Sequence, residues 1–166
     1  AEIEAGEETS GAGRGVVRAP HVPAYLRDLA HYEWAELAVD IMPDRAQVAI
    51  ASGDLMQGRP VVAPAHMLLS YRWPVHRIGI HYRPRKPVAT QLVVFRDRDD
   101  AVQFAEINPV TARLLTLLAD GKTSGRDACR RVAAELNHPQ PDVVVAGGAA
   151  MLENLFDWGV IYGIHV

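Results

Sequence analysis

The sequence predicts an α+β fold whose C-terminal part, residues 89–166, is a winged-helix-like domain. Three observations predict it: two β-rich runs separated by a turn, a helical triplet that contains a tight turn, and a closing β-rich run. The expected order is β-β-α-α-α-β, preceded by a helix and an extended basic segment. Winged helix-turn-helix folds have this order and include both DNA readers and peptide readers, so the fold class leaves the function open.

The β-rich runs of the predicted domain are short. Residues 91–96 and 101–106 are rich in β-branched and aromatic side chains, and the polar residues 97–100 between them favour a turn. We therefore expect an antiparallel hairpin. The run 160–164, which follows a helix-terminating Gly159, is expected to return as a strand against this hairpin.

Three helices are predicted between the hairpin and the closing strand. Asn108-Pro109 provides an N-cap and a proline at the first helical position, and Gly121 ends that helix. Thr123 or Ser124 can cap the second helix, and Asp142 the third. The expected inner faces of the three helices are, in order, Val110, Leu114, Leu117 and Leu118; Ala128, Cys129, Val132, Ala133 and Leu136; and Val144, Gly147, Gly148, Met151, Leu155 and Trp158.

The charges of the predicted domain disfavour DNA binding. Residues 91–166 carry seven basic and ten acidic side chains, a net charge of −3, and no Lys or Arg occurs from 139 to 166. DNA-binding modules normally show a basic stripe that neutralises phosphates. Arg126, Arg130 and Arg131 on the second helix keep a transcriptional regulator as the alternative function, although we favour a solvated outer face as the explanation for these three side chains.

The composition is that of an ordinary globular protein. No apolar run approaches the ~20 residues of a membrane helix, and no signal sequence opens the chain, so we expect a cytoplasmic protein without a membrane partner. Cys129 is the single cysteine, which we interpret as a small buried hydrophobic residue, with a reactive thiol as the alternative.

The segment before the hairpin divides in two. Residues 1–22 are predicted to be a flexible linker, and Ala1–Ala5 resemble the last turn of a missing helical N-terminal domain. Residues 23–88 are predicted to be a helix, from 23 to about 42, followed by an extended connecting segment. The helix places Glu33 within an apolar stripe, where we expect a buried charge paired with an Arg; a general acid or metal ligand is the alternative. The stripe contains Leu26, Leu29, Ala30, Trp34, Leu37 and Ile41.

The connecting segment is basic. No Asp or Glu occurs between Leu55 and Arg96, whereas six Arg, one Lys and three His gather there, which indicates an anionic partner. Within it, 67–71 is predicted to be a strand and 75–81 an alternating extended segment. The His spacings fit no metal motif, and the chain lacks a phosphate loop, a nucleophile elbow and a paired-carboxylate motif. The residues therefore predict a non-catalytic binding module without a metal or cofactor of its own.

Three phrases of the chain together are similar to one known family. Leu29-Ala30-His31-Tyr32-Glu33-Trp34-Ala35-Glu36-Leu37, Tyr71-Arg72-Trp73-Pro74-Val75-His76-Arg77 and Asn108-Pro109-Val110-Thr111-Ala112-Arg113-Leu114-Leu115 resemble the HvfC-type maturation proteins of ribosomally made, modified peptides (RiPPs). That family is often labelled as DNA-binding. The resemblance covers nearly all of the chain after the predicted linker, and the C-terminal part also resembles PqqD-like winged-helix elements that recognise peptides.

The resemblance implies a non-catalytic adaptor that binds a precursor peptide and a TIM-barrel, multinuclear-iron maturase, with the iron held by that enzyme. It implies a peptide strand added at an exposed edge, with a groove beside the last helix. The expected peptide-binding residues are Val102, Gln103, Phe104, Met151 and Leu155, of which Met151 and Leu155 fit core packing equally well. The expected partner-binding residues are Arg72, His76, Arg77, His81 and Arg83.

Overall fold

The structure, a computed structural model, describes residues 22–43 and 49–166. The described chain is a mixed α+β fold with four α-helices and two three-stranded antiparallel sheets. The predicted linker over 1–22 lies, apart from Val22, outside the described residues. The division of the remainder at residues 88 and 89 stays a prediction, but strands from before it complete both sheets.

The larger sheet contains the predicted hairpin. Its strands are β3 (His66–Tyr71), β4 (Thr90–Arg96) and β5 (Val102–Ile107), in the order β3-β4-β5. The hairpin and the strand at 67–71 are therefore confirmed. β4 is the central strand, and four consecutive side chains, from Leu92 to Phe95, are at most 2 % exposed. A strand buried in this way has a layer of side chains on each of its two faces.

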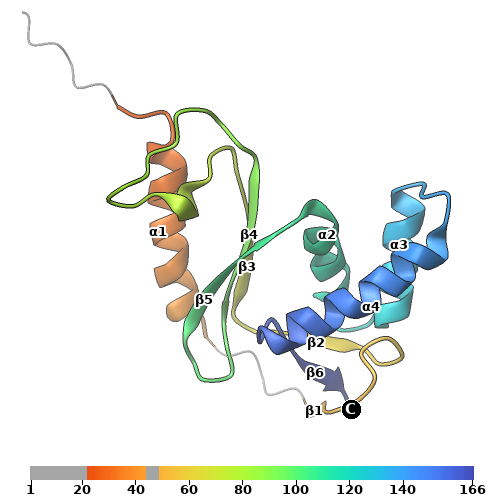
Figure 1. Cartoon of the computed structure of the whole chain (residues 1–166). Coiled ribbons are helices and arrows are strands. Elements are labelled where there is room, and N and C mark those ends of the chain that lie inside the picture. The colour runs from red at the N-terminus through yellow and green to blue at the C-terminus, as the bar shows by residue number, and fades with distance from the viewer. Residues whose placement is uncertain (1–21, 44–48) are drawn as a thin grey trace, which may run out of the picture.

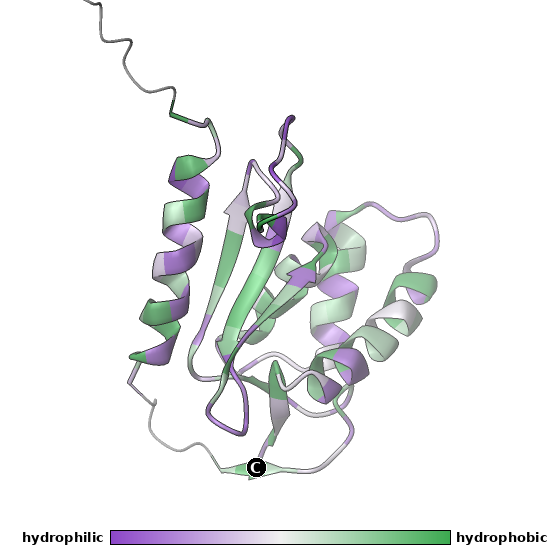
Figure 2. Ribbon diagram, turned by 60° about the vertical axis from the view of Figure 1, so that its left-hand side comes forward, coloured by the Kyte–Doolittle hydropathy of each residue, from purple (hydrophilic) through white to green (hydrophobic). Residues whose placement is uncertain are grey.

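Helices supply both layers (Figures 1 and 2). On one face, α1 (Leu26–Asp40) packs Ala35 and Val39 against Leu92 and Val94 of the sheet. On the other face lie α2 (Pro109–Leu118), α3 (Gly125–Glu135) and α4 (Pro141–Asp157), whose core includes Val93 and Phe95. Alternate residues of β4 thus enter two different cores, because successive side chains of a strand point to opposite faces.

Local signals place most helix ends correctly. The Asn108 side chain accepts a hydrogen bond from Thr111 N at 2.8 Å, and Ser124 Oγ accepts one from Asp127 N at 3.1 Å, which confirms both caps. Gly121 and Gly159 end their helices with positive φ angles of 66° and 81°, as expected of glycine at these positions. The predicted Asp142 cap is wrong, because the N-cap is Gln140 and α4 begins at Pro141, two residues earlier than a cap at Asp142 would place it; Pro is favoured at a first helical position.

The closing strand differs from its prediction. β6 (Ile161–His165) lies between β1 (Ile50–Ala51) and β2 (Pro60–Val62) in a second sheet, so the expected pairing with the hairpin is wrong. Both sides of β4 are already occupied by β3 and β5, and β6 instead pairs with two short strands of the connecting segment.

The predicted extended segment at 75–81 is also wrong. Residues Val75–Arg77 form a short 3-10 helix, η1, after a turn in which the Asp28 carboxylate of α1 accepts hydrogen bonds from Arg72 N and Trp73 N. This contact turns the chain back towards α1 and buries Val75, which is 1 % exposed. Residues 75–77 therefore form a short helical turn around the buried Val75 side chain, instead of an extended segment whose side chains alternate between two faces.

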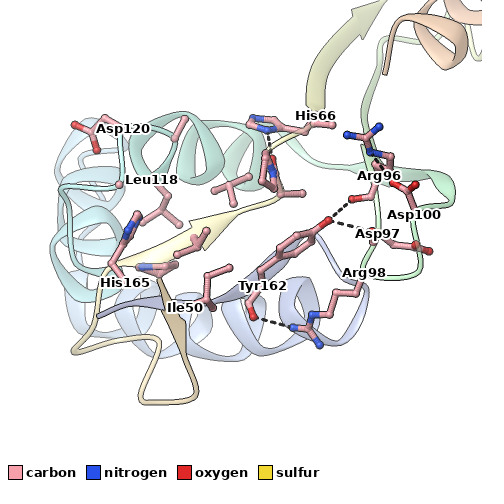
Figure 3. A pocket seen from close by; sticks show the side chains of 18 residues that line it. Ile50, His66, Arg96, Asp97, Arg98, Asp100, Leu118, Asp120, Tyr162 and His165 are labelled. Carbon is pink, nitrogen blue, oxygen red and sulfur yellow. Dashed lines mark hydrogen bonds and ion pairs between the residues drawn. The ribbon is translucent and has the colours of Figure 1, made fainter. Parts of the chain in front are cut away.

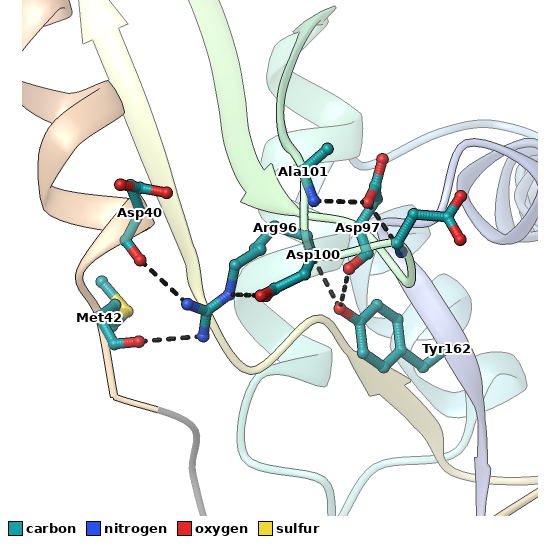
Figure 4. Close-up of polar contacts among 8 residues, drawn as sticks. Asp40, Met42, Arg96, Asp97, Asp100, Ala101 and Tyr162 are labelled. Atoms are coloured by element: carbon teal, nitrogen blue, oxygen red, sulfur yellow. Dashed lines mark hydrogen bonds and ion pairs between the residues drawn. The ribbon is translucent and has the colours of Figure 1, made fainter.

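Arg96 and Tyr162 join the elements around the hairpin turn (Figure 4). The Arg96 guanidinium donates to Asp40 O and Met42 O at the end of α1, both at 3.0 Å, and pairs with Asp100 at 3.0 Å. Tyr162 of β6 donates its hydroxyl proton to Arg96 O and Asp97 O, at 2.7 and 3.0 Å. These bonds fix α1 and the second sheet to one turn.

We expect Tyr162→Phe to lower the free energy of unfolding by about 1 kcal/mol, because buried carbonyl groups lose a hydrogen-bond donor. Urea unfolding followed by circular dichroism measures the change. Tyr82→Phe is the matched control, since Tyr82 is 45 % exposed. Equal stability of the two variants would contradict a joining role for the Tyr162 hydroxyl.

Candidate functional site

The outer edge of β5 presents backbone groups that the sheet does not use. The hairpin closes with Asp97 N donating to Ala101 O at 2.9 Å, which fixes the alternation of the ladder. Gln103, Ala105 and Ile107 consequently bond to β4, whereas the N–H and C=O groups of residues 102, 104 and 106 point away from it. Within the described chain, no backbone hydrogen bond from another element reaches these outward groups.

An apolar pocket of about 280 Å³ opens near the end of this edge. Asn108, two residues beyond the last outward group of β5, is part of its lining. α2, α3 and α4 each supply apolar side chains to the pocket, and the rim residues Val110 and Leu136 are 40 and 50 % exposed. The remaining lining residues are Thr111, Leu114, Cys129, Val132, Val144, Gly147, Gly148 and Met151.

Two adjacent glycines of α4 differ in what surrounds them. A Cβ atom built on Gly148 would lie 2.3 Å from Cys129 Sγ, so the contact between α3 and α4 requires glycine there. A Cβ built on Gly147 would meet nothing within 4 Å. Glycine inside a helix is less favourable than alanine by roughly 0.5–1 kcal/mol. Close packing of α3 against α4 therefore explains the glycine at position 148. No packing contact requires glycine at position 147, where the absence of a side chain leaves the pocket open.

The structure places the predicted peptide-binding residues in several different environments. Val102 and Phe104 are half-buried on the α1 side of the edge strand, where the ring centroids of Phe104 and Tyr32 lie 4.6 Å apart. Gln103 is exposed and donates to Asp97 Oδ2 at 3.1 Å. Met151 lines the pocket. Leu155 is 0 % exposed, so its assignment to a groove is wrong and it belongs to the core.

The pocket rim is made of residues that the helical pattern assigns to the core. Val110 and Leu136 lie on the predicted inner faces but remain about half exposed, and Trp158 is likewise 48 % exposed. Periodicity indicates which helix face is apolar, but it does not indicate how far three helices separate. The signal that was available is the Gly147-Gly148 pair, which marks a place where helices or ligands approach closely.

The predicted partner-binding residues gather around η1 and the loop after it. Arg77 Nη2 donates to Glu106 Oε2 at 2.8 Å, and His76 Nε2 lies 3.0 Å from the same oxygen. The hydrogen bond from Arg77 is the main reason why the pKa of Glu106 lies below its usual value. His76 and Arg77 thus hold β5, whereas Arg72, His81 and Arg83 remain exposed.

A hydrophobic tip lies among these exposed basic residues. Ile80 is 89 % exposed and Tyr82 is 45 % exposed, next to His81. Arg83 donates to the carbonyl groups of Gly79 and Tyr82 and thereby closes the tip. Residues 79–86, which carry these two apolar side chains together with the exposed basic residues His81, Arg83, Arg85 and Lys86, form the segment that we call the basic loop.

Glu33 is not the buried charge that the sequence predicts. Its side chain is exposed, and so are Leu26, Trp34, Leu37 and Ile41 of the same predicted stripe. α1 instead turns Leu29, Tyr32, Ala35 and Val39 towards the sheet. The helix has apolar residues on two sides, and the side that fits the sheet contains the small Ala35, which permits close approach.

A larger, more polar cavity of about 660 Å³ lies between the two sheets (Figure 3). Several of its polar side chains have structural partners: Arg98 donates to Ile161 O at 3.1 Å, Tyr162 donates to carbonyl groups of the hairpin turn, and His66 Nδ1 donates to Ala63 O at 2.6 Å. These side chains hold the sheets together, so we assign them a structural role.

The described residues contain neither a metal-ligand cluster nor a membrane-spanning helix. No group of three or more His, Cys, Asp or Glu side chains is arranged there to hold a metal ion. None of the described helices is both long and apolar enough to cross a membrane. Burial raises the pKa of the Cys129 thiol, as expected of a cysteine packed between helices.

An apolar pocket beside an open strand edge is typical of domains that bind extended peptides. The family model of the HvfC C-terminal domain matches residues 63–156. This range covers more than half of the chain and includes β3, the hairpin and α2 to nearly the end of α4, so the chain belongs to the HvfC family. No curated protein matches the chain.

We expect alanine to have opposite effects at the two adjacent glycines. Gly147→Ala should raise the free energy of unfolding by about 0.5–1 kcal/mol through helix propensity. Gly148→Ala should lower it by about 1–3 kcal/mol, because the new methyl group overlaps Cys129. Chemical denaturation measures both. Destabilisation of similar size at both positions would show that the pocket wall at Gly147 is packed.

The Glu106 contact should make stability depend on pH. Its pKa is lowered in the folded state, so the contact stabilises the fold above the unfolded pKa and loses this effect as pH falls through the lowered value. Glu106→Gln should therefore reduce stability at neutral pH by at most about 1 kcal/mol, since the pair is partly exposed. The wild type and the variant should converge in acid, and a difference that persists there would contradict this assignment.

Proposed function

We propose that this protein is a non-catalytic adaptor that binds a ribosomal precursor peptide and presents it to a multinuclear-iron maturase. The observation that carries the proposal is the open edge of β5, which leads directly to the pocket between α2, α3 and α4. Membership of the HvfC family supports a role in a maturation system. The adaptor has no cofactor of its own, and the iron belongs to the TIM-barrel partner enzyme.

An extended peptide adds a fourth strand to the larger sheet by forming hydrogen bonds with the unused backbone groups of β5. The peptide backbone forms hydrogen bonds with the outward N–H and C=O groups of Val102, Phe104 and Glu106. Because these bonds involve the main chain alone, they depend little on the side chains of the peptide. Specificity then comes from the pocket, into which one large apolar side chain of the peptide projects beside Gly147. The larger sheet has a second edge at β3, but the pocket lies beside the end of β5.

We infer that the C-terminal part is a winged-helix-like element of the PqqD-like type, in which the hairpin supplies the edge and the last helix supplies the groove. The element order β4, β5, α2, α3, α4, β6 supports the comparison. The separate sheet of β6 is a departure from it. We place the activity in the cytoplasm, where ribosomal precursor peptides are made.

The charges favour a peptide over DNA. Two of the three arginines on which the alternative depends, Arg130 and Arg131 of α3, lie 3.7 and 3.5 Å from carboxylates of their own helix, Asp127 and Glu135. Arg113 of α2 pairs with the same Glu135 at 2.7 Å. Arginines that are already paired in this way offer less neutralisation to phosphates.

The basic loop is the proposed contact with the maturase. Ile80 provides an apolar anchor, and the exposed Arg83, Arg85 and Lys86 lie in the same loop. A hydrophobic centre with a charged rim is the usual arrangement at a protein interface. The matching surface of the enzyme is then an apolar hollow bordered by carboxylates.

Filling the pocket should weaken peptide binding without damaging the fold. We expect Gly147→Met to weaken binding of the precursor peptide encoded beside this gene by about tenfold or more. Ala150→Met, which adds the same side chain to an exposed position of α4, is the control and should bind normally. Isothermal titration calorimetry measures both. Tight binding by Gly147→Met would contradict the pocket, and salt-sensitive binding of duplex DNA instead would favour the alternative function.

Charge reversal at Arg72, combined with loss of the apolar side chain of Ile80 in the basic loop, tests the second partner. Arg72→Glu combined with Ile80→Ser should prevent co-elution with the maturase in size-exclusion chromatography while peptide affinity stays within about twofold, because the two sites are separate. Val143→Ser, at an exposed apolar position of α4, is the control for loss of surface hydrophobicity. Co-elution of the double variant at normal strength would show that the enzyme binds elsewhere.

A further inference from the structure

We propose that the outward face of α1 is a docking surface for a helix of another protein, and that this helix carries an apolar stripe with Lys or Arg along one side. The surface lies on the side of the larger sheet opposite α2–α4 (Figure 1). It is thus separate from the pocket, and the inference does not depend on peptide binding.

The main observation is that α1 has two apolar sides and the fold uses one. Leu29, Tyr32, Ala35 and Val39 pack against the sheet. On the opposite side, a second stripe remains in contact with solvent, with exposed fractions of 44 % for Leu26, 53 % for Trp34, 57 % for Leu37 and 70 % for Ile41. Ala30 completes this stripe and is exposed as well.

The spacing of the exposed residues fits a helical partner. Positions 26, 30, 34, 37 and 41 follow one another at intervals of four or three residues and therefore form one continuous line along the helix. Such a line is the surface into which the ridge of a second helix packs. Surface hydrophobic residues scattered singly need no explanation, whereas a contiguous line of this kind marks an interaction site.

Charges beside the stripe define the partner further. Glu33, Glu36 and Asp40 lie along one flank at 100° per residue, and no cation among the described residues forms an ion pair with their carboxylates. A groove of about 450 Å³ runs between this flank and the hairpin turn; Asp100, which is paired with Arg96, also lines it, so Glu33, Glu36 and Asp40 are the carboxylates left for a partner. Basic side chains on the partner helix reach this groove when its apolar stripe covers Trp34 and Leu37.

A second copy of the chain fits this surface less well. In an antiparallel pair of α1 helices, equivalent flanks face each other, so the carboxylates of the two copies are opposed. Arg27 is the permanent cation that α1 itself offers, and it lies on the other flank of the stripe. A different protein with a row of basic residues satisfies both the stripe and the groove.

The test uses two synthetic helical peptides of about 18 residues, roughly the length of α1. Both have the same leucine stripe; one carries Lys along one flank and the other carries Glu at the same positions. Fluorescence anisotropy should show binding of the Lys peptide alone, with an affinity that falls as salt rises. Trp34→Ser and Leu37→Ser should each weaken it about tenfold, and Val143→Ser should not.

Two controls keep the outcomes separate. Urea unfolding should show that the α1 variants are as stable as the wild type, because the substituted side chains are exposed. Glu33→Gln combined with Glu36→Gln should remove most of the salt dependence. Equal binding of the Glu peptide, no binding of either peptide, or a dimer in sedimentation that Trp34→Ser dissociates would each overturn the proposal, the last in favour of a second copy.

Discussion

Burial of β4 on both faces is the constraint on which the rest of the structure depends. Leu92 and Val94 require cover on one side, and Val93 and Phe95 require it on the other. α2–α4 supply one layer, and α1 supplies the second from a segment far away in the sequence. Because a central strand without its second layer would expose apolar side chains to water, α1 is an integral part of the fold rather than a connecting element.

The same constraint determines where the surfaces for partners lie. With β3 on one side of β4, β5 becomes the other edge of the sheet, and its end continues directly into the cap of α2 at Asn108. The three helices that cover the sheet have a pocket between them beside that edge. Gly147 lines this pocket, and its lack of a side chain leaves space there. On the far side, α1 covers the sheet with its narrower face and leaves Trp34 and Leu37 in solvent.

The parts that the sequence predicts correctly are those set by local chemistry. The turn at 97–100, the Asn108 and Ser124 caps and the glycines that end α2 and α4 all act within a few residues. The face of α1 was not predictable in this way, since the helix is apolar on two sides and the sheet selects one. The pairing of β6 with β1 and β2 depends on contacts about a hundred residues apart, and the pocket depends on how three helices separate.

Amide hydrogen exchange of the protein with and without its precursor peptide tests the central claim most directly, because the outward and inward amides of β5 alternate. In the free protein, Gln103 and Ala105 should exchange slowly and their outward neighbours quickly. We expect the peptide to slow exchange at Val102, Phe104 and Glu106. Unchanged exchange there, or slowing confined to Leu68 and Ser70 on the outer edge of β3, would contradict peptide addition at β5.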